Sequence, residues 1–93
     1  MSVACQDPLV EALREEIVML DQELVETVNK RLRVVARLWR HKREQGMALA
    51  SPEREEWLLR ELSSSNEGPL SDAGLAGLHA FVLGLTKEEL ADG

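Results

Sequence analysis

The most constraining feature of the sequence is the stretch between Pro8 and Gly46, which contains no Pro or Gly. It is rich in Leu, Ala, Glu and Arg, and Gly46 is a C-cap signal, so we expect a helix over about residues 8–45. At about 1.5 Å per residue this helix is roughly 55 Å long, far beyond the usual length. Two short helices from the same chain cannot cover it. We therefore expect an intertwined homodimer in which a second chain completes the packing.

Two further helices follow from the capping signals. Residues 51–53 read as an N-cap Ser, a Pro at the first helical position and an acidic first turn, which predicts a helix over about 52–63. The breakers in 66–69 end this region, and another N-cap signal opens a helix over about 72–90. We expect the Ser triplet 63–65 to lie in the intervening loop. The predicted fold class is all-α, with one domain over residues 1–93.

Composition excludes several function classes. The net charge is −6 and basic residues do not alternate with aromatic ones, which argues against a nucleic-acid partner. No apolar run is long enough to cross a bilayer, which argues against a membrane partner. The sequence also lacks a signal-peptide pattern, which argues against export. The single Cys5 is interpreted as an incidental thiol of a reduced, cytoplasmic protein. His41 and His79 lack Cys or His partners at metal-ligand spacing, so no metal site is expected.

Cations lie on the apolar face of the first predicted helix. That face follows steps of three and four residues through Leu13, Ile17, Leu20, Leu24 and Val28. The same steps lead to Arg31 and Lys42, which point the same way with Cα atoms about 16 Å apart. Long side chains reaching toward each other would leave a gap suited to a small organic anion. Arg14 lies about 42 Å along the helix from Lys42, so it reaches this gap only from an antiparallel second chain.

Polar groups also interrupt the apolar faces of the two shorter helices. Glu55 shares a face with Leu58, Leu59 and Leu62, so its carboxylate should meet a cation or a ligand donor. Arg54 is either a supporting partner of Glu55 or a surface residue. The predicted inward stripe of the third helix is Leu75, Leu78, Val82 and Thr86.

Each polar residue also has an ordinary explanation. The cations can keep their heads in water, Glu55 can stabilise the first turn of its helix, and Thr86 can bond to its own helix backbone. Two cations, an acid and a hydroxyl on apolar faces of so short a chain nevertheless indicate a ligand pocket.

Six segments of the sequence form a combined pattern. They are Leu13-Arg14-Glu15-Glu16-Ile17, Leu20-Asp21, Asn29-Lys30-Arg31-Leu32, Lys42, Pro52-Glu53-Arg54-Glu55 and Asn66-Glu67-Gly68-Pro69-Leu70-Ser71-Asp72. Together they resemble the all-helical class of chorismate mutase. The resemblance runs from about Val10 to Leu90, in the order and spacing of the family.

This resemblance implies a fold, a reaction and a set of site residues. The fold is an intertwined dimer of three-helix chains, and the reaction is the rearrangement of chorismate to prephenate in the shikimate pathway, without cofactor or metal. Arg14 of the partner chain and Arg31 would hold the substrate carboxylates. Lys42 would donate to the ether oxygen and Glu55 would accept from the substrate hydroxyl. Ser51 matches a position that touches that hydroxyl through its backbone, and Thr86 matches a serine that contacts a carboxylate.

One position departs from the family pattern. Leu90 stands where the family usually has Gln or Glu as a second donor to the ether oxygen, and the adjacent Glu89 is the candidate to replace that donor. The sequence therefore predicts a modest enzyme, which an activating partner enzyme of the same pathway could complete. A sister reaction on 4-amino-4-deoxychorismate or isochorismate stays open. So does a non-catalytic helical dimer that binds a metabolite or regulates a partner.

Overall fold

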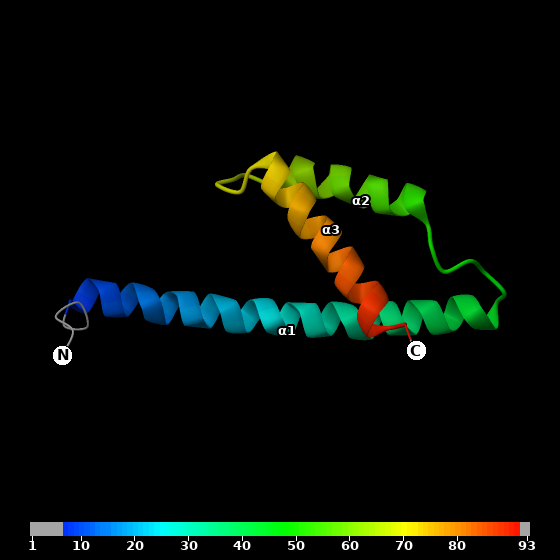
Figure 1. Ribbon diagram of the computed structural model, residues 1–93, viewed down its shortest axis with the longest axis horizontal. Helices are drawn as coiled ribbons and strands as arrows, with labels where there is room; N and C mark the ends of the chain where they lie inside the picture. The colour runs from blue at the N-terminus through cyan, green and yellow to red at the C-terminus, as the bar shows by residue number, and fades with distance from the viewer. Residues whose placement is uncertain (1–6, 92–93) are drawn as a thin grey trace. The chain divides into compact units, whose positions relative to one another are not determined.

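The computed structural model describes residues 7–91, and within them it contains helices only. These are α1 (Pro8–Glu44), α2 (Pro52–Ser65) and α3 (Asp72–Glu89), labelled in Figure 1. The all-α prediction is confirmed, and each predicted helix end lies within two residues of the observed one. Cys5, which supported the expected cytoplasmic setting, lies outside the described residues.

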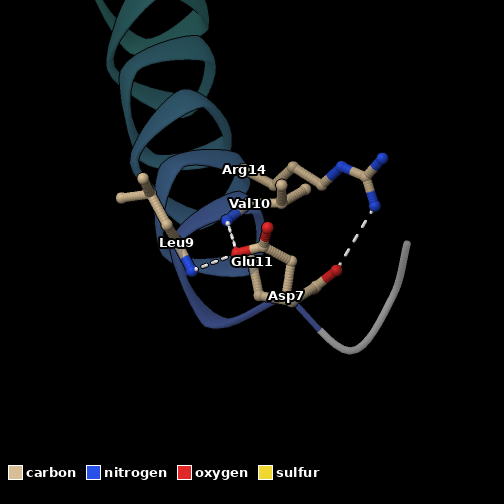
Figure 2. A network of polar contacts seen from close by, with 5 residues as sticks. All are labelled: Asp7, Leu9, Val10, Glu11 and Arg14. Atoms are coloured by element: carbon tan, nitrogen blue, oxygen red, sulfur yellow. Dashed lines mark hydrogen bonds and ion pairs between the residues drawn. The ribbon is translucent and has the colours of Figure 1, made fainter. Parts of the chain in front are cut away.

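Side chains that accept from free backbone N–H groups begin all three helices. Asp7 Oδ1 accepts from the N–H of Leu9 at 2.9 Å and of Val10 at 3.3 Å, as Figure 2 shows. Ser51 caps α2 through Arg54 N at 3.3 Å, and Ser71 caps α3 through Gly74 N at 3.0 Å. Each cap satisfies backbone donors that a helix start leaves without an intrahelical partner.

The end of α1 is closed by a Schellman arrangement around Gly46. This residue has φ of 67°, a left-handed conformation that glycine adopts without steric cost. Gly46 N donates to Arg43 O at 3.2 Å, and Met47 N donates to Lys42 O at 2.7 Å. The chain therefore leaves the helix in a defined direction one turn beyond Lys42.

The Ser triplet 63–65 was predicted to lie in a loop, and this is wrong: it forms the last turn of α2. Ser costs a helix only about half a kcal/mol relative to Ala, and Ser65 Oγ donates to Leu62 O at 3.2 Å. Helix α2 ends instead at Asn66, whose backbone is extended. Its Oδ1 accepts from Gly68 N at 2.9 Å and its Nδ2 donates to Leu70 O at 2.8 Å, which closes the turn into α3.

The chain divides into an N-terminal unit, residues 1–33, and a C-terminal unit, residues 34–93, with the division inside α1. In the C-terminal unit α2 packs against α3. The buried residues there are Leu75, His79 and Thr86, which share one face of α3 at steps of four and seven residues. Leu78, predicted to point inward, is 47% exposed. His79 takes its place because it lies closer to the direction shared by Leu75 and Thr86.

The stripe predicted on the first helix is largely exposed in the single chain. We call Leu13, Ile17, Leu20, Leu24 and Val28 the α1 stripe. Its first four members are 47–62% exposed, whereas Val28 is half-buried. A helix face this apolar is ordinarily covered by another element. In the part of the chain that the structure describes, no helix has the length and apolar character needed to span a membrane.

Candidate functional site

Lys42 lies at the end of α1 and is half-buried, as its position on the apolar face predicts. Its ammonium Nζ donates to the carbonyl oxygen of Leu49 at 3.3 Å. That bond spans the connection between α1 and α2, because the Schellman turn at Gly46 brings the chain back past the helix end. Lys42 is therefore a cation held at a fixed place, with further donor capacity on its ammonium.

Glu55 occupies the first turn of α2, where Glu55 N donates to Ser51 O at 3.0 Å. Its carboxylate is half-buried, and Oε1 lies 3.7 Å from Nζ of Lys87 on α3. The expectation that this acid meets a cation is confirmed. Arg54 does not serve as that partner: its guanidinium stacks 3.9 Å from the centre of the Trp57 ring on the exposed side of α2.

Lys87 was not singled out from the sequence, although a signal was present. It is the single Lys or Arg of the α3 sequence, and it falls in the last turn, where the helix dipole favours a cation. An acid on the inward face of α2 that needs a cation from α3 therefore has one candidate. That argument requires knowing that α2 and α3 pack together, which sequence pattern alone did not establish.

Thr86 precedes Lys87 and is buried, as predicted. Its Oγ1 donates to Val82 O at 2.7 Å, the bond to its own helix that was the ordinary explanation for a threonine here. The buried hydroxyl thus stands one residue before the cation that pairs with Glu55.

The end of α3 carries Glu89 and Leu90. Glu89 is exposed, whereas Leu90 is half-buried and its N–H donates to Thr86 O at 3.0 Å. Leu90 lines a cavity of about 310 Å³ with Ala36, Trp39, Arg40 and Arg43. The position where the family pattern expects a donor is thus an apolar side chain in a partly enclosed space.

The two predicted arginines belong to the N-terminal unit. Arg14 is exposed and pairs with Glu11, with Nη1 3.3 Å from Oε1 (Figure 2). Such a pair at the surface contributes little to stability and leaves the guanidinium available to another ligand. Arg31 is half-buried on α1. Their meeting with the residues of the C-terminal unit stays a prediction.

His79 is a further buried polar residue whose burial sequence reasoning missed. Its Nε2 is buried and has no hydrogen-bond partner within residues 7–91. Its spacing gave the signal, since it follows Leu75 by one turn and precedes Thr86 by two. The structure thus brings Glu55 and Lys87 together between α2 and α3 and places Lys42 beside the α1–α2 connection, and charged groups of these kinds suit electrostatic recognition of a small polar ligand.

Known proteins match this chain over most of its length. The family model described as chorismate mutase type II matches residues 13–89. A bifunctional chorismate mutase/prephenate dehydratase of Pseudomonas aeruginosa is 38% identical over 86 residues, which are 87% of this chain and 23% of that protein. The chain thus spans about a quarter of the length of that curated relative.

Two solved structures are similar to this chain in fold. Form I of chorismate mutase from Thermus thermophilus has a TM-score of 0.81 and 28% identity, covering 83% of this chain and 96% of that one. Form II has a TM-score of 0.82 and 28% identity, covering 85% and 90%. The fold, the match to the family model and the similarity to the Pseudomonas protein agree, and this chain belongs to the type II chorismate mutase family.

Proposed function

We propose that this chain catalyses the rearrangement of chorismate to prephenate. The observation that carries the proposal is the family match over residues 13–89, because it spans every charged residue predicted to touch the substrate. The chain supplies cationic hydrogen-bond donors (Arg14, Arg31 and Lys42) and a carboxylate acceptor (Glu55), and this one-substrate reaction needs groups of these kinds. It breaks one C–O bond and forms one C–C bond in the same molecule.

The proposed mechanism rests on positioning and electrostatics. Arg31 and the partner's Arg14 bind the two carboxylates and hold the substrate in its folded, reactive conformer, which lowers the entropic part of the barrier. Lys42 donates to the ether oxygen, where negative charge grows as the C–O bond breaks. Glu55 and the backbone at Ser51 bind the ring hydroxyl, and Thr86 contacts a carboxylate. Glu89 is assigned a further contact with the substrate.

We also propose that the working form is a homodimer, in which residues 1–93 form one domain completed by the second chain. Association would remove the exposed apolar side chains of the α1 stripe from water, and burial of apolar surface is the main driving force of most protein association. The exposed α1 stripe and the placement of Arg14 far along α1 from Lys42 support the same assembly.

The dimer is proposed to act in the cytoplasm, with modest activity alone. Leu90 supplies no hydrogen bond to the ether oxygen, and loss of one such donor lowers the rate by about a hundredfold or more. An enzyme of the same pathway that reshapes this end of the site would raise the rate. Near-normal activity of the purified chain would refute the role assigned to Leu90.

The test follows chorismate by ultraviolet absorbance and identifies the product by chromatography. Wild type should form prephenate, and Lys42→Ala should lower kcat/KM by about a hundredfold or more. Lys30→Ala is the matched control, because Lys30 is an exposed cation on the same helix. A dimer that leaves chorismate unchanged, or equal losses in the two variants, would refute the proposal.

A further inference from the structure

The Glu55–Lys87 pair adds a charge to the place where the substrate's ring substituent is proposed to bind. Lys87 Nζ lies 3.7 Å from Glu55 Oε1, joining α3 to α2 across a packed pair of helices. The Glu55 side chain is 32% exposed, so part of its carboxylate is open to a ligand while the ammonium occupies another part. The ring substituent would therefore meet a carboxylate that already has a cation beside it.

This arrangement affects neutral and cationic ligands differently. A neutral hydroxyl donates to the carboxylate and gains from it whether or not a cation stands nearby. A ligand ammonium on the same carboxylate gains the attraction of Glu55 but is repelled by the like charge of Lys87. The pair therefore favours a hydroxyl over an amine at this position.

Two cations assigned or considered for this site from the sequence have other partners in the structure. Lys42 donates to the Leu49 carbonyl, and the Arg54 guanidinium lies over the Trp57 ring. Within residues 7–91, Lys87 is the cation that forms the ion pair with Glu55. The selectivity is thus assigned to one side chain outside the set predicted from the sequence.

We propose that Lys87 is a specificity-determining residue that makes the site prefer chorismate, with its ring hydroxyl, over the 4-amino analogue. The inference rests on the proposed function, because it takes Glu55 as the group that meets the ring substituent. Both compounds would undergo the same internal rearrangement, in which the ether C–O bond breaks and a C–C bond forms. No co-reactant is required. The amine of the analogue carries a proton at neutral pH, as aliphatic amines do.

The experiment compares kcat/KM for chorismate and for its 4-amino analogue in four proteins: wild type, Lys87→Gln, Lys87→Arg and Arg60→Gln. Lys87→Gln should shift the ratio toward the amine by about fivefold, the size of a like-charge interaction near the surface. Lys87→Arg keeps the charge and should keep the ratio. Arg60→Gln removes an exposed cation of α2 and controls for net charge. Lys87→Met is a second neutral variant, and circular dichroism checks that each protein folds.

The two proposals fail in different ways. Wild type without turnover of either compound would refute the proposed function, and the ratio of calorimetric dissociation constants would then decide the role of Lys87. An unchanged ratio in both Lys87→Gln and Lys87→Met would overturn the inference, as would an equal shift in Arg60→Gln. An equal loss of kcat/KM for both substrates would also overturn the inference, because it would show that Lys87 has only a structural role.

Discussion

Replacing Leu20 by Ala tests whether a second chain covers the α1 stripe. Leu20 is 62% exposed in the single chain. Full burial of a Leu stabilises by about 1.5–3 kcal/mol, so a partner that covers this exposed part contributes about 1–2 kcal/mol per copy. A two-fold dimer contains two copies. The variant should therefore lose about 2–4 kcal/mol of association free energy, a rise in the dissociation constant of about 30- to 1000-fold.

Sedimentation equilibrium over a range of protein concentrations measures this shift directly. Glu15→Ala is the matched control, because it introduces the same side chain on the opposite side of α1. The control should leave the dissociation constant nearly unchanged. Equal behaviour of the two variants, or a wild-type chain that stays monomeric at micromolar concentration, would show that another element covers the stripe or that nothing does.

Three smaller predictions concern the helix ends and the interior of α3, all measured by urea unfolding of the dimer at fixed concentration. Ser51→Ala removes the side-chain acceptor for Arg54 N and should lower the free energy of unfolding by about 1 kcal/mol per chain. Gly46→Ala places a Cβ at φ of 67° and should cost about 1 kcal/mol or more, although no atom lies within 4 Å of that Cβ. Gly77→Ala, also with no atom within 4 Å, should gain about 0.5–1 kcal/mol from helix propensity. A loss at Gly77 would indicate that another chain packs there.

The fold was predictable because local signals mark its boundaries. Pro8, Pro52 and the capping residues Ser51 and Ser71 locate helix starts, and Gly46 locates the end of α1. These signals act through the backbone within one turn, so they can be read without knowing the packing. The prediction that the Ser triplet 63–65 forms a loop was wrong because a weak helix propensity does not by itself end a helix. The backbone hydrogen bonds of α2 continue through these residues.

The candidate site was predictable only in part, since a site depends on which faces meet. The inward positions of Glu55 and Thr86 followed from periodicity and are confirmed. Lys87 as the partner of Glu55 depends on the packing of α2 against α3, and the burial of His79 depends on the direction of that packing. The roles of Arg14 and Arg31 require a second chain and stay predictions.

The hydrogen bond from Lys42 to Leu49 has a consequence for how this segment tolerates mutation. Its acceptor is a main-chain carbonyl, which any amino acid at position 49 would also provide. Residues 47–50 are therefore free to change side chain while the ammonium keeps its partner, provided that the backbone path is preserved. Alanine scanning of the segment would register little of this contact, whereas an amide-to-ester replacement of the peptide bond that follows Leu49, which weakens that carbonyl as an acceptor, would reveal it.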